Sequence, residues 1–239
     1  MTDLNGKYAL ITGASSGIGR VTAIALAKLG VNLLLVSRSA TKLATVAEEA
    51  QALGVSAETY AIDLSQVSTV REQIAAIVTR QPIDILINNA GMGYTGTLDT
   101  MPLEDWQTLL NLNVTSVFQC VQAALPSLRD RGGAIVNIVS VAGQQVFPGW
   151  VGYCTSKFAL MALTRGIAAE ERTNGLRVTA ICPGSVNTSI WDTPTVDADF
   201  DRTAMLTPET VAATIIHVLS LPKSAVVEEI TIMPSAGIF

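Results

Sequence analysis

The sequence carries little charge, few aromatic side chains and a single histidine. Charged residues make up 15% of the 239 positions, and aromatic residues make up 5%. Lysine and arginine number 15 against 20 aspartates and glutamates, so the formal net charge is −5. Because an acidic chain without a basic run is repelled by phosphate backbones, nucleic acid is excluded as its main partner. The hydrophobic share of 49% is large enough to form a sizeable core.

Cysteine is also scarce, and no segment resembles an export signal or a membrane span. Cys120, Cys154 and Cys182 are odd in number and widely spaced, which fits neither a disulfide framework nor a metal-binding motif. Residues 1–7 lack a basic segment followed by an apolar one, and no apolar run is long enough to cross a bilayer. We therefore expect a cytoplasmic protein that does not bind membranes.

Two further features could be mistaken for functional sites. Aspartates alternate at positions 197, 199 and 201 like the start of a calcium loop, but Arg202 stands where that loop needs glycine. No metal site is therefore predicted. His217 lies between apolar residues of an expected helix, and we interpret it as a partly buried packing residue rather than a catalytic base.

Short apolar segments alternate with longer segments of helical periodicity. The expected strands are rich in Val, Ile and Leu and several lack polar alternation, as in a parallel sheet covered on both faces. They cover residues 8–12, 31–36, 58–62, 84–88, 134–139, 177–181 and 229–232. The expected helices cover residues 18–29, 40–53, 67–79, 103–128, 151–173 and 208–219. This alternation predicts an α/β fold: one Rossmann-like domain over residues 1–239, with a doubly wound parallel sheet of about seven strands and helices on both faces.

One segment interrupts this alternation before the last expected helix. Residues 188–205 are polar and include Pro194 and four aspartates. Long irregular segments inside a compact domain are usually functional, so we predict that residues 188–206 form a mobile lid over a substrate site. Trp150 and Trp191 flank the expected crevice, where they either line an apolar pocket or cap the core or an interface.

The first expected strand is followed at once by the segment TGASSGIG, residues 12–19. Gly13 permits a tight turn, Gly17 lets the backbone approach a pyrophosphate, and Gly19 lets the next helix pack close to the sheet. The free N–H groups at the start of that helix attract phosphates. This context favours a dinucleotide site over an ordinary Gly-Ser turn. Its expected members are Gly13, Ser15, Ser16, Gly17, Ile18 and Gly19.

The end of the second expected strand distinguishes NAD from NADP. NAD enzymes usually place a carboxylate about 20 residues after the glycines, but no acidic residue occurs between Asp3 and Glu48. The strand instead ends in Ser37, Arg38 and Ser39. A guanidinium can bind a 2′-phosphate through two N–H groups, and the two hydroxyls add further donors. The sequence therefore predicts NADP(H) as cofactor, the alternative being that Arg38 is a solvated loop residue.

Two further strand ends carry candidates for cofactor binding. Asp63 and Leu64 follow the third strand, where the carboxylate either accepts a hydrogen bond from an adenine amino group or belongs to the start of the next helix. Asn89, Ala90 and Gly91 end the fourth strand, beside the point where a doubly wound sheet reverses its strand order. Ligands bind at that point in such folds, although an Asn-Gly turn is the alternative.

Four residues are candidates for the chemistry. Tyr153 and Lys157 are four positions apart on an expected helix, so they share one face. A phenol with a pKa of about 10 is a poor base at neutral pH, and a nearby ammonium lowers that pKa. Ser140 ends the fifth strand, where its hydroxyl could bind a substrate oxygen. Asn113 lies inside an expected helix, as either an ordinary polar residue or the holder of a relay water near Lys157.

In this order and spacing, the residues resemble the short-chain dehydrogenase/reductase family. The match adds Pro183, Gly184, Val186 and Thr188 as expected cofactor contacts, together with Tyr153 and Lys157 themselves. The family resemblance covers most of the chain, and it implies a small carbonyl or alcohol as substrate. It also implies a homo-tetramer or dimer formed through the two longest helices.

The resemblance assigns a role to each of the four chemical candidates. It implies that Tyr153 is the general acid and base and that Ser140 positions the carbonyl. Lys157 would lower the tyrosine pKa and bind the nicotinamide ribose, and Asn113 would anchor the relay water.

Several functions fit this resemblance. We expect an NADPH-dependent oxidoreductase that interconverts a ketone or aldehyde and an alcohol, of the carbonyl reductase type. One alternative is a 3-oxoacyl-[acyl-carrier-protein] reductase, for which Arg129, Arg131 and Arg172 could bind the acidic carrier protein. Residues 92–106 lack the Thr-Arg-Asp sequence often seen in such bacterial reductases. A non-enzymatic alternative is an NADP(H)-binding sensor.

Overall fold

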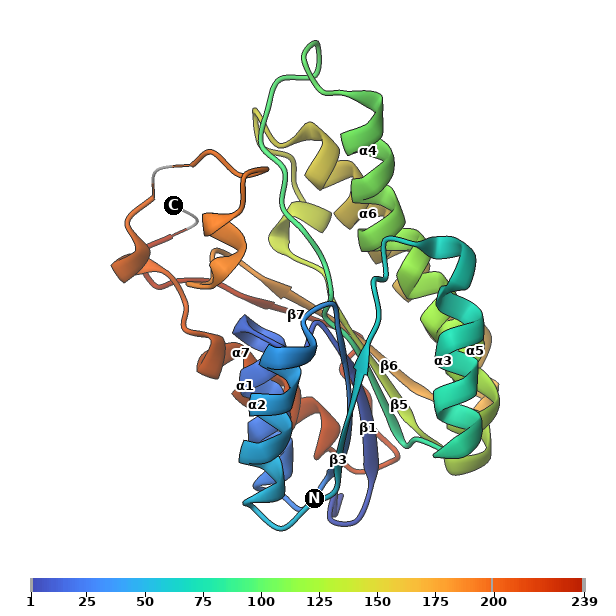
Figure 1. Cartoon of the computed structure of the whole chain (residues 1–239). Coiled ribbons are helices and arrows are strands. Elements are labelled where there is room, and N and C mark those ends of the chain that lie inside the picture. Colours follow the sequence, from blue (N-terminus) through green and yellow to red (C-terminus); the bar gives the residue numbers. More distant parts are fainter. Residues whose placement is uncertain (1, 199, 238–239) are drawn as a thin grey trace.

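The computed structural model describes residues 2–198 and 200–237, and it contains one seven-stranded parallel sheet (Figure 1). The strand order is β3-β2-β1-β4-β5-β6-β7, and every neighbouring pair is parallel. The strands are β1 (Tyr8–Thr12), β2 (Asn32–Ser37), β3 (Ala57–Ala61), β4 (Ile85–Asn88), β5 (Ala134–Ile138), β6 (Arg177–Pro183) and β7 (Glu229–Ile232). The predicted doubly wound, Rossmann-like fold is confirmed.

Helices cover both faces of the sheet, with α1, α2 and α7 on one face and α3, α5 and α6 on the other (Figure 1). Their bounds are α1 (Gly17–Ala27), α2 (Ala40–Gln51), α3 (Val67–Arg80), α4 (Leu103–Leu110), α5 (Ser116–Arg131), α6 (Val151–Glu171) and α7 (Pro208–Leu219). Within the described residues, no helix is long and apolar enough to cross a membrane.

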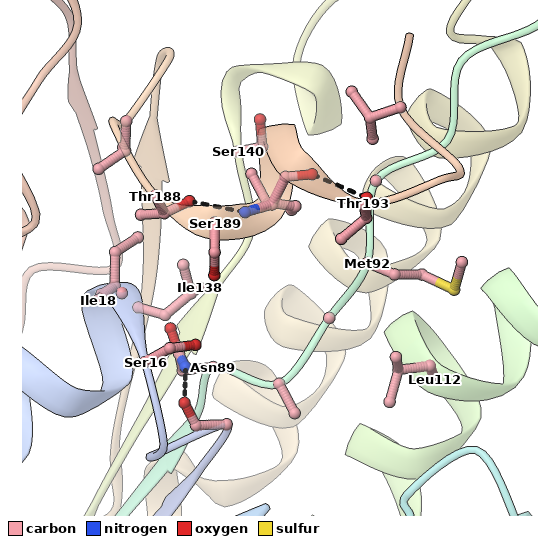
Figure 2. A pocket seen from close by; sticks show the side chains of 18 of the residues that line it. Ser16, Ile18, Asn89, Met92, Leu112, Ile138, Ser140, Thr188, Ser189 and Thr193 are labelled. Carbon is pink, nitrogen blue, oxygen red and sulfur yellow. Dashed lines mark hydrogen bonds between the residues drawn. The ribbon is translucent and has the colours of Figure 1, made fainter. Parts of the chain in front are cut away.

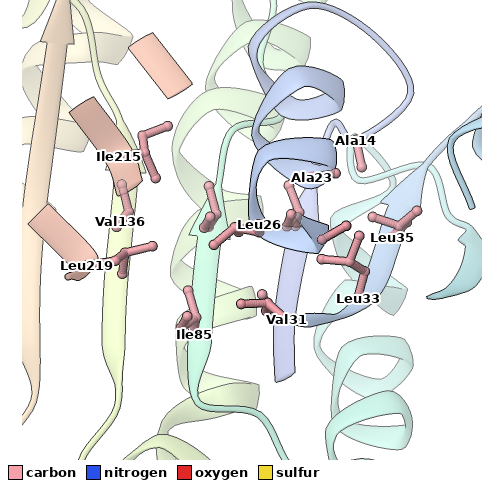
Figure 3. Close-up of a cluster of buried hydrophobic side chains, with 14 of the residues drawn as sticks. Ala14, Ala23, Leu26, Val31, Leu33, Leu35, Ile85, Val136, Ile215 and Leu219 are labelled. Carbon is pink, nitrogen blue, oxygen red and sulfur yellow. The ribbon is translucent and has the colours of Figure 1, made fainter. Parts of the chain in front are cut away.

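The central strands are apolar throughout because both of their faces are buried. In β2, Leu33 and Leu35 belong to the core under α1, whereas Leu34 and Val36 belong to the core on the opposite face. All four side chains are 0% exposed. Figure 3 shows the first of these cores, in which Leu26 of α1 lies over the sheet. Successive residues of a strand point to opposite faces, so two cores require the continuous apolar runs seen in the sequence.

The main departure from the predicted elements lies in the helical segment expected at residues 103–128. The structure divides it into α4, one π-helical turn at Asn111–Thr115, and α5, which continues to Arg131. A π turn inserts an extra residue without interrupting the apolar periodicity by much, so the pattern alone reads as one helix.

Two smaller expectations also change. His217 is exposed rather than partly buried, because the buried face of α7 is formed by Val211, Ile215 and Val218. Of the three alternating aspartates, Asp201 accepts hydrogen bonds from the backbone and hydroxyl of Thr203, whereas residue 199 lies outside the described part of the chain.

Candidate active site

A cavity of about 640 Å³ opens where the strands end, under residues 188–196. The carboxyl ends of parallel strands meet at one edge of the sheet, and the order reverses there between β1 and β4, which is where such folds bind ligands. Figure 2 shows Ser16, Ile18 and Asn89 on one side of this cavity and Met92 and Leu112 on the other. The structure brings all of the predicted site residues to its lining except Gly19 and Asn113, which lie behind it.

The glycine turn after β1 leaves no room for side chains at two positions. Gly13 has a φ of 65°, and a Cβ there would lie 2.7 Å from Asn89 Nδ2 and 2.9 Å from Ala90 Cα. A Cβ on Gly19 would collide with the carbonyl oxygen of Gly13. The tight turn and the close helix approach are therefore both observed.

Asn89 holds this turn in place through hydrogen bonds to its backbone. Its Nδ2 donates to the carbonyl oxygens of Thr12 and Gly13, at 3.0 and 3.2 Å. The Thr12 hydroxyl in turn accepts from the backbone N–H groups of Asn89 and Ala90, both at 3.0 Å. Both amide donors of Asn89 are thus used within the protein, so this residue shapes the site by joining the ends of β1 and β4.

The first turn of α1 presents its N–H groups to the cavity. Ser16 is the N-cap residue, yet its side chain makes no capping hydrogen bond, and the first turn contains no acidic residue. Uncapped N–H groups and the helix dipole together favour an anion at this position. A pyrophosphate fits a cradle of this kind.

Two cations lie at the start of α2, where the sequence predicted one. Arg38 and Lys42 both line the cavity and are exposed, and neither forms an ion pair among the described residues. Ser39 is the N-cap of α2 and accepts from the Lys42 N–H at 3.4 Å, while the Ser37 hydroxyl accepts from the Ser39 N–H at 3.3 Å. Lys42 was missed, although its position one helical turn after the cap was a usable signal.

Asp63 lines the cavity but is not the helix cap that one of its two interpretations suggested. Its Oδ1 accepts from the backbone N–H of Ser65 at 3.0 Å and from the Ser65 hydroxyl at 2.8 Å. The N-cap of α3 is Gln66. Asp63 therefore closes the turn before the helix while its carboxylate faces the cavity.

Lys157 lines the cavity and is almost fully buried. The residue is 6% exposed, and Nζ donates to the carbonyl oxygen of Ile138 at 3.0 Å. Nζ also lies 5.7 Å from the centre of the Tyr153 ring, so the i, i+4 spacing does bring the two side chains together. Burial lowers the pKa of Lys157 to about 8, since a low-dielectric setting disfavours the ammonium.

Tyr153 is half-buried, and burial raises the pKa of its phenol to about 12, although a hydrogen bond with the Ser140 side chain acts in the opposite direction. The sequence interpretation expected the neighbouring ammonium to dominate and to lower this pKa. In the structure, removal from water is the larger influence. The phenol is therefore protonated at neutral pH.

Ser140 follows β5 at the point where the chain turns into the cavity. Its hydroxyl accepts from the Ala142 N–H at 3.1 Å and so caps the short helical turn Val141–Gly143. It is also the only described non-glycine residue with a positive φ, 154°. The hydroxyl interacts with the Tyr153 phenol, so both groups can bind one oxygen atom.

Asn113 is placed behind the cavity by the π turn. Its Oδ1 accepts from Met92 N–H at 2.9 Å, and its Nδ2 donates to the Met92 carbonyl at 2.9 Å and to the Ser156 hydroxyl at 3.0 Å. Asn113 is 1% exposed. Its two side-chain donors therefore join the segment after β4 to α6, and neither is left for a water molecule.

Aromatic residues and the predicted lid close the other end of the cavity. Trp150 and Trp191 both line it, which confirms the pocket interpretation of the two side chains. The lid lies against the segment after β4, where the Thr195 hydroxyl donates to the Gly93 carbonyl at 2.8 Å and Thr95 N–H donates to the Thr195 carbonyl at 2.9 Å. Thr195 therefore ties this segment to the residues that follow β4, whereas the predicted mobility of the lid stays a prediction.

Comparison with known proteins identifies the family. The family model described as short chain dehydrogenase matches residues 7–197. The chain belongs to the short-chain dehydrogenase/reductase family. It is 34% identical to a 3-oxoacyl-[acyl-carrier-protein] reductase from Synechocystis, over 94% of each chain.

Solved structures of the family resemble this short-chain dehydrogenase/reductase closely. An alcohol dehydrogenase from Thermococcus sibiricus, complexed with 5-hydroxy-NADP, has a TM-score of 0.88 and 31% identity over 96% of this chain and 97% of its own. A short chain dehydrogenase from Mycobacterium paratuberculosis, bound to NAD, has a TM-score of 0.85 and 25% identity over 97% of each chain. The protein is thus an oxidoreductase acting on CH–OH or C=O groups in a fold that binds NAD or NADP.

Proposed function

We propose that this enzyme is an NADPH-dependent carbonyl reductase that converts a ketone or aldehyde to an alcohol. The observation that carries the proposal is the meeting of Ser140, Tyr153 and Lys157 in one cavity with the glycine turn of β1. The cavity thus joins a phosphate cradle to a buried proton donor.

The choice of NADPH rests on the charges at the start of α2. Arg38 and Lys42 offer two cations beside the Ser39 cap, and β2 ends without a carboxylate that would repel a 2′-phosphate. A dianion also gains from the N–H groups of the helix start. When bound, NADPH supplies the hydride for the reduction.

The protein supplies the proton and holds the carbonyl. Tyr153 is protonated at neutral pH because burial raises its pKa to about 12, so it can act as a general acid. The Ser140 hydroxyl, next to the phenol, donates a hydrogen bond to the carbonyl oxygen as negative charge develops on it. The ammonium of Lys157, 5.7 Å from the phenol ring, stabilises the phenolate that remains after proton transfer.

The decisive experiment compares NADPH oxidation by the wild type and by Tyr153→Phe across a panel of ketones and aldehydes. Loss of a general acid lowers kcat by about 10²–10⁴-fold, while the Kd for NADPH, measured by fluorescence titration, is expected to change little. Undiminished turnover by Tyr153→Phe would refute the mechanism. If the wild type binds NADPH tightly but reduces no carbonyl, the protein is a sensor rather than a reductase.

A second candidate is reduction of 3-oxoacyl groups on a carrier protein, which the Synechocystis relative makes worth testing. The three arginines that were expected to bind the carrier protein do not favour this activity. Arg129 pairs with Glu171, Arg131 with Asp84, and Arg172 with Glu228. Arg129 and Arg131 lie in the last turn of α5, and Arg172 follows the end of α6, at the edge where the strands begin, opposite the cavity. A higher kcat/KM for an acetoacetyl-carrier protein than for simple ketones would nevertheless establish this activity.

We also propose that the enzyme assembles as a homo-tetramer or dimer through α5 and α6, its two longest helices. Phe118 of α5 and Phe158 of α6 are 44% and 42% exposed, which is unusual for such large apolar side chains. Light scattering after size exclusion tests this. The double variant Phe118→Glu with Phe158→Glu is expected to yield smaller species, whereas Leu98→Glu, at a residue 69% exposed on a loop, is not.

A further inference from the structure

Of the charged side chains among the described residues that line the cavity, that of Lys157 lies near the aromatic rings, with Nζ 5.7 Å from the centre of the Tyr153 ring. Among the described lining residues, the charged ones are Arg38, Lys42, Asp63 and Lys157. We call the part beyond Ser140, under the lid, the substrate end; it is lined by Met92, Leu112, Phe147, Trp150, Ile190 and Trp191. None of these six residues is charged, so a carboxylate or phosphate placed among them would lose its hydration without gaining an ion pair, which is costly.

Four aromatic rings connect the catalytic helix to the lid. The Trp150 ring lies 5.6 Å from the Tyr153 ring at 64° and 5.9 Å from the Trp191 ring at 73°. Trp191 in turn lies 5.4 Å from Phe200 at 88°. These edge-to-face geometries are the favoured ones for aromatic pairs, and each contact is energetically significant.

Trp150 is fixed by the backbone at the start of α6. Its N–H donates to the Phe147 carbonyl at 3.1 Å, and its carbonyl accepts from the Cys154 N–H at 2.8 Å. It lies three residues before Tyr153, so the two rings share one face of the helix. Trp150 therefore makes edge-to-face contacts with both Tyr153 and Trp191 and links the two rings.

Trp191 is held equally firmly from the lid side. Its Nε1 donates to the Val186 carbonyl at 2.7 Å, which fixes the plane of the indole. Val196, further along the lid, is 8% exposed and lies close to Gly93, where an added Cβ would come within 2.8 Å of it. These contacts present Trp191 to Trp150 in a defined orientation.

From this arrangement, and resting on the proposed carbonyl reduction, we propose that Trp150 determines substrate specificity. Its indole selects an uncharged carbonyl compound with an apolar, ring-sized body, which it holds against the phenol beneath Trp191. A flat apolar ring gains contact area against an indole at little cost in conformational entropy, whereas a short-chain ketone leaves that surface uncovered.

The test compares three ketones in steady-state NADPH oxidation: a cyclic ketone, the same ketone carrying a carboxylate, and a three-carbon ketone. The wild type is expected to prefer the neutral ring over its carboxylated form by about 100-fold in kcat/KM, the cost of burying an unpaired charge. Trp150→Ala is expected to lower kcat/KM for the neutral ring by about tenfold or more, and for the three-carbon ketone by less than about threefold. Trp150→Phe is expected to restore most of the lost selectivity.

Two controls separate specificity from general damage. Trp106→Ala makes the same truncation on α4, at a half-buried side chain outside the cavity lining, and is expected to leave the ratio of the two neutral ketones unchanged. In a double-mutant cycle, Trp150→Ala and Trp191→Ala are expected to be non-additive for the ring ketone, because their rings are in contact.

Several outcomes overturn this assignment while leaving carbonyl reduction intact. These are equal losses for ring and three-carbon ketones in Trp150→Ala, additive effects in the cycle, or a wild-type preference for the carboxylated ketone. Absence of turnover with every ketone and aldehyde tested would instead count against the proposed function itself.

Discussion

The two ends of the cavity are built in different ways. The cofactor end is formed by backbone, with the glycine turn after β1, the uncapped start of α1, and two cations at the start of α2. The substrate end is lined by large apolar side chains, above all Trp150 and Trp191, together with hydroxyl groups such as those of Ser189 and Thr193. One end is suited to phosphates and the other to uncharged groups.

This difference follows from what each end has to bind. Phosphates are recognised by N–H groups and charge at fixed places, which requires a rigid turn anchored to the sheet. A substrate body is recognised by shape, which side chains on loops supply. The two ends meet at Tyr153 and Lys157, where burial shifts the pKa of both groups away from their ordinary values.

The largest expected effect is on NADPH binding, and it tests whether the backbone of the glycine turn matters more for the cofactor end than the side chains beside it. Gly19→Ala is expected to weaken NADPH binding by at least about 100-fold, because its Cβ collides with the Gly13 carbonyl and displaces the turn. Ser15 lines the same cavity, and Ser15→Ala removes only a hydroxyl. We therefore expect this variant to bind NADPH less than about tenfold more weakly than the wild type. Isothermal titration measures both, with thermal unfolding as the check on folding. Equal losses would show that side chains matter as much as the backbone.

The next effect concerns charge at the cofactor end. Arg38→Ala is expected to lower the NADPH-to-NADH ratio of kcat/KM by about 10–100-fold, the value of a charge-assisted phosphate contact. Lys42→Ala is expected to lower it less, since an ammonium cannot bind a phosphate in bidentate fashion. Arg20→Ala is the control, because Arg20 pairs with Glu49 and does not line the cavity. If the wild type uses NADH as well as NADPH, the role assigned to Arg38 is wrong.

A third effect belongs to the junction between the two ends. Burial lowers the pKa of Lys157 to about 8, so its ammonium is present below that pH and lost above it. Reduction that depends on the ammonium should therefore fall above pH 8, by about tenfold per unit. The Tyr153 phenol cannot cause this loss, because its pKa is about 12.

The pH dependence of kcat/KM between pH 6 and 10 measures this loss. Lys157→Arg provides the control, since a guanidinium remains charged throughout that range. Its residual activity is expected to be flat above pH 8. If kcat/KM still falls above pH 8 in Lys157→Arg, the titrating group is not Lys157.

The sequence predicted the glycine turn and the strand ends well, because the backbone conformation at these positions restricts the residue type. Gly13 and Gly19 occupy positions where a Cβ does not fit, and Arg38 lies at the end of β2 as its pattern indicated. The strands were equally readable, since burial on both faces demands apolar runs such as Leu33–Val36. Local rules of this kind need no knowledge of distant contacts.

What the sequence could not supply are properties set by residues far apart in the chain. The donors of Asn113 are taken by Met92 and Ser156, a pairing made possible by a π turn that leaves little trace in the apolar pattern. The raised pKa of Tyr153 depends on how much of the fold covers it, and i, i+4 spacing to Lys157 does not reveal that. Trp150 and Trp191 lie 41 positions apart in the sequence, and only the fold of the segment before α7 brings their rings into contact.

The smallest effect is expected at the substrate end, where Arg202 braces the lid internally. Its guanidinium donates to Asn187 Oδ1 at 2.9 Å, to Asp192 Oδ1 at 2.9 Å and to the Thr188 carbonyl at 2.8 Å. Two of these partners immediately precede the short helical turn Ser189–Asp192 and the third ends it, so Arg202→Ala is expected to loosen the segment that carries Trp191. Because the side chain is 36% exposed, each contact contributes modestly.

Arg202→Ala is therefore expected to raise the KM for a ring ketone by about three- to tenfold, with the Kd for NADPH unchanged within about twofold. Arg172→Ala removes a comparable exposed ion pair, to Glu228, at the opposite edge of the sheet and should alter neither constant. Comparing the change in KM for the ketone with the change in Kd for NADPH then shows whether Arg202 affects one end of the cavity or both. A change in the Kd for NADPH as large as that in KM would mean that the lid braces both ends, and that the cavity behaves as one site rather than two.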